Sequence, residues 1–331
     1  MEWIAGDIGG TKSWLAWLVR ESAGGQQRLR FEQCYASADF ASVDSLLHRF
    51  IADAGAPGLP DGLLLALPGA LDGQRVKLTN LDWTLDAAEL QTALGIREVR
   101  FINDFQAAAA GVATLTDADV IALNPQPSEP GGVRAITGAG TGLGLAFMLP
   151  DADGGYQNFA TEGGHIDFSP ANAQQTRLLE RLRTAYGRVS WERVVSGLAM
   201  NDLYQFCCAE QGCTPRDETI DGAALAVRAE SGDAAAEAAL DLFVDLYGAW
   251  VGNVALLFQP RGGLYIAGGV ATHMQARMQS SRFMAAATDK GRMRGVVERT
   301  PIFLITCKRL GVQGAMASAM AQSRGAFFAT P

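Results

Sequence analysis

Short apolar runs alternate with segments of helical periodicity through the first third of the chain. Residues 3–5 and 13–20 form apolar runs on either side of a glycine-rich turn, which predicts two strands joined as a hairpin. Residues 41–54 place apolar side chains at helical spacing, and residues 62–67 form a continuous apolar run typical of a buried strand. Further strands are expected at 76–78 and 99–102, and further helices at 84–94, with Thr84 or Asp86 near the cap, and at 105–115. This alternation is typical of an α/β domain.

The same strand–turn–strand pattern recurs in the middle of the chain. After a surface connection rich in Pro and Gly at 126–132, a strand over 133–137 enters the turn Gly138-Ala139-Gly140-Thr141-Gly142-Leu143-Gly144, and a second strand over 145–149 leaves it. Residues 223–258 predict two long helices interrupted near Gly232. The remaining expected elements are a strand over 263–267 that runs into Gly268-Gly269, a strand over 301–306 and a final helix over 311–322.

Length, composition and charge narrow the class of protein. The 331 residues suffice for one large or two ordinary domains, and a hydrophobic fraction of 48% supports extensive cores. The formal net charge of −8 argues against a general nucleic-acid binder, which would normally carry a basic face. No signal peptide is recognisable, and no stretch reaches the roughly 18–20 uninterrupted apolar residues of a membrane span. We therefore expect a soluble cytoplasmic protein that binds neither nucleic acid nor membrane.

The five cysteines do not suggest a disulfide framework, because their number is odd and their positions are scattered. Cys207, Cys208 and Cys213 lie close enough in sequence for a zinc site to be considered. Their spacing fits no standard ligand pattern, and residues 202–211 predict a helix. We expect reduced thiols with a structural role.

The two glycine-rich turns are candidate phosphate-binding loops. Glycine lets the backbone turn tightly and brings N–H groups close to a ligand. The first turn, Gly6-Asp7-Ile8-Gly9-Gly10-Thr11, adds the hydroxyl of Thr11 and the carboxylate of Asp7, which suits Mg²⁺ or its water shell. Taken alone, this turn is equally an ordinary glycine hairpin. A second turn with four glycines in seven residues instead suggests two loops facing one polyphosphate.

Neither turn matches the commonest nucleotide-binding motifs. No Gly-Lys-Ser/Thr follows at the spacing of a Walker loop. The second turn runs into a predicted strand, whereas a dinucleotide fingerprint opens a helix. Backbone amides, rather than a Walker lysine, would therefore hold the phosphates.

Two further clusters carry candidate chemistry. Asn103-Asp104 lies where a predicted strand meets a predicted helix, so Asp104 is a helix N-cap, a reactive carboxylate kept ionised by the helix N-terminus, or both. Glu162-Gly163-Gly164-His165 predicts a loop that approaches a small ligand closely, and carboxylates and imidazoles match the hydroxyls of a polyol. His165 is equally a structural histidine, and no third ligand completes a metal site with Glu162.

With these motifs assembled, the chain resembles the bacterial glucokinase family of the actin-like sugar kinases, nearly end to end. The residues that carry the resemblance are Asp7-Ile8-Gly9-Gly10-Thr11, Thr79-Asn80 with Trp83, Ile102-Asn103-Asp104-Phe105, the turn Gly138 to Gly144, Glu162-Gly163-Gly164-His165 with Phe168 and Pro170, Val189-Ser190 and Glu192-Arg193-Val194 with Ser196-Gly197, and Ile266-Ala267-Gly268-Gly269. Each motif is modest alone, but their order and spacing together are highly specific.

The resemblance implies a two-lobed α/β fold of the actin-like ATPase (ribonuclease H-like) type with a central cleft. The smaller lobe would comprise residues 1–112 plus 310–331, and the larger lobe residues 113–309. The implied catalytic base is Asp104, and the implied sugar-binding residues are Asn80, Asn103, Asp104, Glu162, His165 and Glu192. The implied nucleotide-binding residues are Asp7, Gly9, Gly10, Thr11, Gly138, Gly140, Thr141, Gly268 and Gly269.

The activity that the resemblance implies is phosphoryl transfer from ATP to the 6-hydroxyl of D-glucose, with Mg²⁺ as cofactor. No residue is expected to bind Mg²⁺ directly, and Asp7 would contact it through the ion's water shell. The active protein would be a homodimer. The alternatives are an ATP-dependent kinase of another hexose, such as mannose, fructose or an amino sugar, and a non-catalytic sugar sensor on the same fold.

Overall fold

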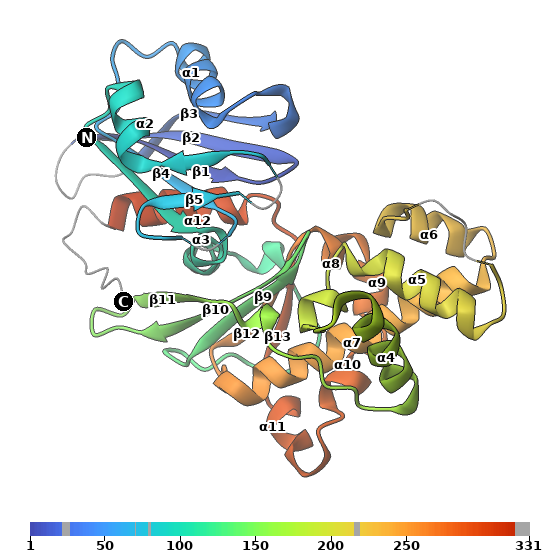
Figure 1. The fold of residues 1–331 in the computed structure, drawn as a ribbon. Coiled ribbons are helices and arrows are strands. Elements are labelled where there is room, and N and C mark those ends of the chain that lie inside the picture. The colour runs from blue at the N-terminus through green and yellow to red at the C-terminus, as the bar shows by residue number, and fades with distance from the viewer. Residues whose placement is uncertain (22–26, 70, 79–80, 215–218, 322–331) are drawn as a thin grey trace. The chain divides into compact units, whose positions relative to one another are not determined.

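The computed structural model describes residues 1–21, 27–69, 71–78, 81–214 and 219–321. The chain divides into two compact units (Figure 1). The first unit comprises Met1–Thr116 with Cys307–Pro331, and the second comprises Asp117–Thr306. Each unit has one main β-sheet with helices packed against it, so each is an α/β unit in its own right.

The first unit is built on a five-stranded sheet. Its strands are β1 (Glu2–Ile8), β2 (Lys12–Arg20), β3 (Gln27–Ala36), β4 (Gly62–Leu67) and β7 (Glu98–Asn103), in the order β3-β2-β1-β4-β7, with β5 (Arg75–Lys77) and β6 (Thr84–Asp86) as a separate pair. Its helices are α1 (Val43–Ala54), α2 (Ala87–Leu94), α3 (Asp104–Gly111) and α12 (Leu310–Ala321). The first predicted hairpin is confirmed, because β1 pairs antiparallel with β2.

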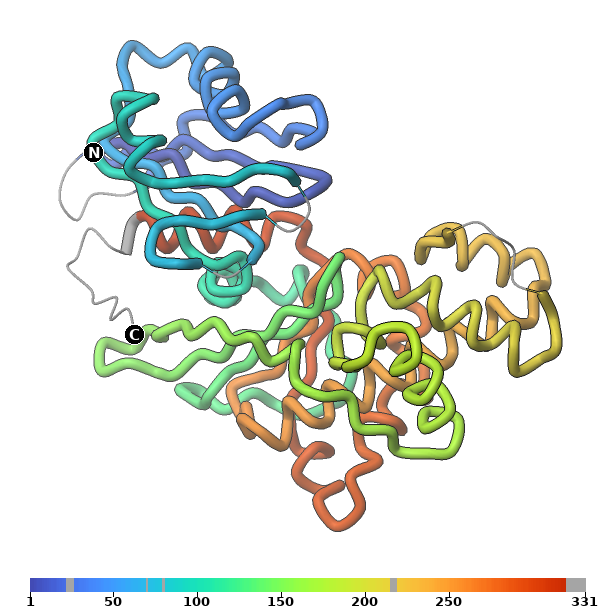
Figure 2. Tube along the Cα trace, viewed as in Figure 1, coloured from blue at the N-terminus to red at the C-terminus, as the bar shows by residue number. Residues whose placement is uncertain are grey.

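Helices cover both faces of this sheet. Leu46 and Phe50 of α1 belong to a buried cluster on one face, which also includes residues of α2. Ala107 of α3 and Ala315 of α12 pack with Trp3 on the other face. Helix α12 contacts β1 and α3. The last helix of the described chain, coloured red, therefore packs in the unit that begins with residue 1 (Figure 2).

The parallel strands β1, β4 and β7 end at the same edge of the sheet. Their register pairs Asp7 with Ala66, and Ala66 with Ile102. Because neighbouring strands lie roughly 4.8 Å apart, Asp7 and Ile102 are separated by two strand spacings, roughly 10 Å. Asn103 and Asp104 directly follow Ile102. The candidate polar groups of this unit therefore lie at the carboxyl ends of strands, where open α/β sheets bind ligands.

Two predicted helix boundaries in the first unit are wrong. The helix expected over 84–94 begins at Ala87, because the three preceding residues form β6, which pairs with β5, and of the two expected cap residues Asp86 is confirmed. Asp86 caps α2 by accepting hydrogen bonds from two backbone N–H groups, at 2.8 and 3.2 Å. Helix α3 ends at Gly111 and continues as one turn of 3₁₀-helix, short of the expected residue 115.

Strand β3 has no sequence prediction, since its mostly half-buried residues contain no continuous apolar run.

The second unit is built on a six-stranded sheet. Its strands are β8 (Val120–Ala122), β9 (Arg134–Ala139), β10 (Leu143–Pro150), β11 (Tyr156–Thr161), β12 (Gly263–Ala267) and β13 (Ile302–Ile305), in the order β11-β10-β9-β12-β13-β8. Its helices are α4 (Ala173–Tyr186), α5 (Ala199–Glu210), α6 (Gly222–Glu230), α7 (Ala234–Phe258), α8 (Gly269–His273), α9 (Gln275–Met278), α10 (Ser281–Thr288) and α11 (Arg294–Glu298).

The main sequence predictions for the second unit are confirmed. Strands β9 and β10 pair antiparallel, as the second predicted hairpin requires. The helical interruption near Gly232 separates α6 from α7. Helix α4 has no sequence prediction, because it buries only Gln175, Leu178 and Leu182 and its other residues are half-buried or exposed. Strands β8 and β11 are likewise missing from the prediction, since both lack buried apolar residues.

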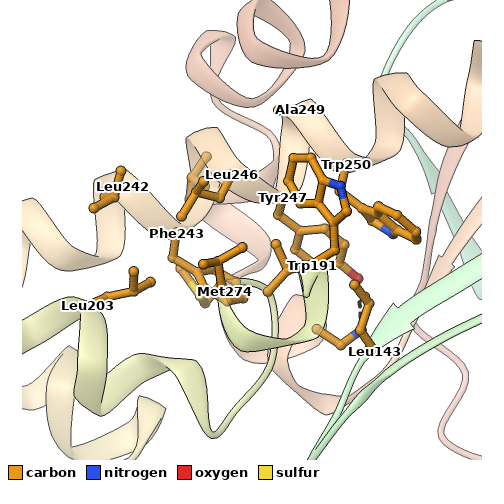
Figure 3. Packing of buried hydrophobic residues seen from close by; sticks show 14 of the residues in the cluster. Leu143, Trp191, Leu203, Leu242, Phe243, Leu246, Tyr247, Ala249, Trp250 and Met274 are labelled. Atoms are coloured by element: carbon orange, nitrogen blue, oxygen red, sulfur yellow. Dashed lines mark hydrogen bonds between the residues drawn. The ribbon is translucent and has the colours of Figure 1, made fainter. Parts of the chain in front are cut away.

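Helix α7 forms the core of the second unit. Tyr247 and Trp250 are fully buried, with Phe243 5.8 Å from Tyr247 and Trp191 5.7 Å from Trp250 between ring centroids (Figure 3). By length and composition alone α7 could cross a membrane, but 72% of its apolar window is buried inside the structure. Helix α7 is therefore a core helix of the second unit.

The three neighbouring cysteines lie in and just after α5. Cys207 and Cys208 are buried, and burial raises the pKa of Cys207 to about 12 and that of Cys208 to about 11. Both thiols are therefore neutral and pack as small apolar groups. Cys213 is exposed, and its thiol donates to the carbonyl of Cys208 at 3.3 Å. Within the described ranges, no group of three or more His, Cys, Asp or Glu residues is placed to hold a metal ion.

Candidate active site

The first glycine hairpin joins β1 to β2 and is held by a serine far away in sequence. The backbone N–H of Gly9 donates to the carbonyl of Lys12 at 2.9 Å, which closes the turn. The Ser37 hydroxyl donates to the carbonyl of Gly9 at 2.7 Å and lies 2.9 Å from the hydroxyl of Ser13. Thr11 is exposed at the turn. Ser37 thus holds the hairpin backbone in place, and the exposed side chain of Thr11 is accessible to a ligand.

Asp7 is the penultimate residue of strand β1, just before this hairpin, and lies against Gly311 near the start of α12. A Cβ on Gly311 would collide with the carboxylate of Asp7, so glycine is required there. The residue keeps some exposed surface, but desolvation of its carboxyl raises its pKa to about 6. No hydrogen bond from another described residue reaches the Asp7 side chain. A desolvated carboxylate without a protein partner is the chemistry expected beside a hydrated divalent cation.

Asn103 and Asp104 have different roles at the N-terminus of α3. Asn103 is the N-cap, and its Oδ1 accepts from the N–H groups of Phe105 at 2.9 Å and Gln106 at 3.3 Å. The interpretation of Asp104 as the N-cap is therefore wrong. Asp104 is half-buried in the first helical turn, where its Oδ1 accepts from the N–H of Phe105 at 2.8 Å. The helix dipole favours the charged form of a carboxylate placed there.

Asn80, predicted as a neighbour, lies outside the described residues.

The second glycine hairpin joins β9 to β10 and rests on α7. The backbone N–H of Ala139 donates to the hydroxyl of Tyr247 at 3.0 Å. Below it, the indole N–H of Trp250 donates to Thr137 Oγ1 at 2.9 Å, and that hydroxyl donates to the carbonyl of Gly144 at 2.7 Å. Figure 3 shows Tyr247 and Trp250 on α7 next to Leu143 at the start of β10. Buried, fully bonded polar groups of this kind fix the hairpin backbone.

The tip of this hairpin is open. Thr141 is exposed, and the N–H of Gly140 donates to the carbonyl of Gly142 at 2.9 Å. The carbonyl of Gly140 accepts from the N–H of Gly197 at 2.7 Å, which ties the tip to the segment before α5. A side chain on Gly140 would meet no atom within 4 Å. The space over Gly140 is therefore accessible to a ligand that approaches the backbone.

Gly268 and Gly269 lie next to the second hairpin. Strand β12 runs parallel to β9 with Ala267 opposite Gly138, so Gly268 follows at the same edge of the sheet. Gly268 has φ +97° and packs against the carbonyl of Ala139 so closely that a Cβ would collide with it. Both Gly268 and Gly269 are exposed. Glycine is thus required at 268 for conformation and packing, and it leaves the backbone open to a ligand.

Glu162, His165 and Glu192 form one cluster in the second unit. His165 Nε2 lies 3.8 Å from Glu162 Oε2, and His165 Nδ1 lies 3.8 Å from Glu192 Oε1. Both distances exceed a hydrogen bond, so the imidazole lies between two carboxylates without bonding to either. Glu162 and His165 are more than half exposed, and Glu192 is 29% exposed. A hydroxylated ligand could therefore bond to all three groups.

Packing of two chain segments places this cluster. The carbonyl of Ile166 accepts from the N–H of Trp191 at 3.0 Å, which brings the segment of His165 beside that of Glu192. Gly164 lies directly on the carbonyl of Leu143, and a Cβ there would collide with it. Thr161 Oγ1 accepts from the N–H of Gly163 at 3.1 Å and donates to the carbonyl of Leu145 at 3.0 Å. The glycines are thus needed because the loop packs tightly on β10.

The described site residues fall into two sets, one in each unit. The first unit holds Asp7, Gly9, Gly10, Thr11, Asn103 and Asp104, and the second holds Gly138, Gly140, Thr141, Glu162, His165, Glu192, Gly268 and Gly269. Within the second unit, the sugar-type cluster and the glycine hairpin are adjacent, since Glu192 bonds to the N–H of Leu143 at 3.0 Å. Ser37 and Thr161, which brace the two loops, have no sequence signal beyond being small hydroxyl residues.

The open tip of the second hairpin gives a testable prediction. Gly140→Val should weaken binding of a non-hydrolysable ATP analogue by roughly 10-fold or more, because hydrogen bonds to a charged group contribute about 1.5–3 kcal/mol each. The fold should be spared, since the new Cβ enters open space. Isothermal titration calorimetry gives the Kd. Gly58→Val, at another glycine with no atom within 4 Å, is the matched control and should bind nucleotide normally. An unchanged Kd for Gly140→Val would remove this loop from the phosphate site.

Comparison with known proteins gives a consistent result. The family model described as Glucokinase matches residues 4–322. A glucokinase of Nostoc punctiforme is 38% identical over 336 aligned positions, covering 94% of this chain and 97% of that protein. The crystal structure of a glucokinase from an Antarctic psychrotroph superimposes with a TM-score of 0.82 at 28% identity, covering 97% of this chain and 99% of that one. A glucokinase of the ROK family from Streptomyces griseus, solved with glucose and AMPPNP, has a TM-score of 0.61 at 19% identity over 97% of this chain and all of that one, a likeness of fold alone.

These comparisons confirm the α/β sugar-kinase fold predicted from the motifs. The match of the family model spans both units, and the relatives are covered almost completely by this chain. The motif residues quoted from the sequence lie within the matched range. The chain belongs to the glucokinase family.

Proposed function

We propose that this protein transfers the γ-phosphoryl group of ATP to the 6-hydroxyl of D-glucose. The observation that carries the proposal is the Glu162–His165–Glu192 cluster, which lies within one hydrogen bond of a glycine hairpin. Such a pairing places a polyol-binding group beside a phosphate-binding loop. The two units would be the lobes of the enzyme, with the smaller lobe spanning about residues 1–112 plus 310–331 and the larger lobe 113–309.

ATP and Mg²⁺ fit the residues available. Backbone N–H groups at the tips of the two hairpins would bind phosphate oxygens, as nests of amides do elsewhere. Gly268 and Gly269, both exposed, would let the adenosine approach the backbone of the larger lobe. Asp7, desolvated and without a protein partner among the described residues, would hold water molecules of the Mg²⁺ shell. When bound, Mg²⁺ would neutralise charge on the β- and γ-phosphates.

Asp104 is proposed as the base. The 6-hydroxyl oxygen of glucose attacks the γ-phosphorus, the bond from that phosphorus to the bridging oxygen breaks, and ADP leaves. The hydroxyl proton passes to the carboxylate of Asp104. Because the transition state is loose, the hydroxyl becomes acidic only late, and a weakly basic carboxylate suffices. The hydrogen bond from the N–H of Phe105 and the dipole of α3 orient and stabilise that carboxylate.

The sugar cluster gives the next prediction. Glu162→Gln and His165→Ala should raise the KM for glucose by roughly 10-fold or more while lowering kcat less, because polar groups built to bond a hydroxyl are left unpaired or absent. Steady-state kinetics at saturating ATP measures both constants. Asp151→Asn, on the turn after β10, is a control that should keep the wild-type KM. A wild-type KM in both cluster variants would make the loop structural and refute its role in sugar binding.

The identity of the sugar is the most specific part of the proposal. Its alternatives are a kinase of mannose, fructose or an amino sugar, and a sensor that binds sugar without chemistry. A panel of these sugars with ATP, ADP or polyphosphate as donor decides among them: we expect the highest kcat/KM for glucose with ATP. A higher value for another hexose would reassign the substrate, and binding without turnover would indicate a sensor.

We further propose a cytoplasmic homodimer that binds neither nucleic acid nor membrane, and light scattering tests the dimer.

A further inference from the structure

Gly142 belongs to the second glycine hairpin, yet a side chain of the sugar cluster lies where a Cβ on Gly142 would point. A Cβ built on Gly142 would lie 2.5 Å from Glu192 Oε2 and 3.3 Å from Glu192 Cδ. Two residues earlier, a Cβ on Gly140 would meet nothing within 4 Å. Non-bonded heavy atoms are most stable at roughly 3.5–4.0 Å, so only glycine at 142 leaves this carboxylate where it is.

The two oxygens of Glu192 have different partners. Oε2 accepts a hydrogen bond from the backbone N–H of Leu143 at 3.0 Å, immediately after Gly142. Oε1 lies 3.8 Å from His165 Nδ1 and is not in hydrogen-bond contact with it. A hydrogen bond from a fixed backbone amide orients a carboxylate and lowers the cost of ordering it when a ligand binds. The hairpin therefore aims one oxygen of Glu192 at the cluster.

We infer that the second glycine hairpin is part of the sugar site, with Gly142 as the positioning residue for Glu192. This inference rests on the proposed function, because the ligand of the cluster is taken to be glucose. One loop would then serve both substrates: its tip at Gly140 and Thr141 meets the nucleotide, and its exit at Gly142 and Leu143 holds a sugar ligand.

The matched pair Gly142→Ala and Gly58→Ala tests the inference. Without nucleotide, Gly142→Ala should weaken glucose binding by roughly 10- to 100-fold, the range expected when a hydrogen bond to a charged group is lost. Gly58→Ala adds the same methyl group in open space outside the proposed site and should bind glucose with the wild-type Kd. Calorimetry measures each Kd, and the affinity of the ATP analogue for Gly142→Ala should fall much less than that for glucose. Equal glucose affinity in Gly142→Ala and wild type would overturn the inference.

A double-mutant cycle with Glu192→Ala shows whether the effect passes through Glu192. In the Glu192→Ala background the added methyl has no carboxylate to displace, so Gly142→Ala should cause no further loss of glucose affinity. A further loss of the same size as in the wild-type background would contradict the inference. If Gly142→Ala alone unfolds, the double variant should recover the Tm of Glu192→Ala, and failure to recover it would also contradict the inference. Absence of glucose binding by the wild type would instead refute the proposed function itself.

Discussion

Asp104→Asn is expected to lower kcat by roughly 10²- to 10⁴-fold, the usual cost of losing a general base. Asparagine keeps the size of the side chain and its oxygen can still accept from the N–H of Phe105, so α3 should form normally. Glucose binding should weaken far less than turnover, because the missing function is proton acceptance. Stopped-assay kinetics at saturating ATP, with glucose Kd from calorimetry, separates the two effects.

Asp44→Asn is the matched control for this variant. Asp44 also lies in the first turn of a helix, α1, but far along the chain from the proposed site residues. The same chemical change there should leave kcat at the wild-type value. Near-normal turnover in Asp104→Asn would remove Asp104 from the role of base.

Asp7→Asn is expected to lower kcat/KM for MgATP by roughly 10²- to 10³-fold, the loss seen when one preorganised electrostatic contact at a reacting centre is removed. The asparagine side chain is neutral and holds the water shell of a divalent cation less strongly. Titrating Mg²⁺ at fixed ATP should therefore show a weaker apparent affinity for the ion. Activity and Mg²⁺ dependence equal to those of the wild type would refute the role proposed for Asp7.

The same variant should be more stable than the wild type when no ligand is bound. Desolvation raises the pKa of Asp7 from 3.8 to about 6, so the folded protein binds this proton more tightly than the unfolded chain. The contribution of Asp7 to stability is therefore full below about pH 4 and is lost as the pH rises to about 6. About two pKa units correspond to about 3 kcal/mol above pH 6. Urea unfolding at pH 4 and pH 7.5 should show equal stabilities at the lower pH and a more stable Asp7→Asn at the higher pH; a less stable variant at pH 7.5 would contradict this.

Much of the fold could be predicted because its elements carry local patterns. Both hairpins have apolar strands on either side of glycine turns, and the helices α1 and α7 have apolar residues at helical spacing. Strand β3 and helix α4 escaped prediction because β3 has no fully buried residue and α4 buries only three, and each is stabilised by pairing or packing with residues far away in sequence. The late start of α2 has the same cause, since the pairing of β6 with β5 overrides the helical pattern.

The residues of the candidate site were likewise predictable where a local motif marks them and not where they depend on distant residues. Motif order indicates Asp104, Glu162, His165 and Glu192, and the structure brings the last three into one cluster. The sequence alone does not distinguish Gly140, which faces open space, from Gly142, which makes room for Glu192, because that difference depends on a residue 50 positions later. Ser37 could not be predicted for a similar reason, since it braces Gly9 across 28 positions.

The most direct test of the central claim is an assay of glucose 6-phosphate formation coupled to its NADP-dependent dehydrogenase. Purified protein with glucose, ATP and Mg²⁺ should produce glucose 6-phosphate and ADP in equal amounts, with a typical kinase kcat of roughly 1–100 s⁻¹. Omitting either glucose or Mg²⁺ should abolish the signal. The absence of glucose 6-phosphate, in a folded protein shown by calorimetry to bind both glucose and the ATP analogue, would contradict the assignment of glucokinase activity.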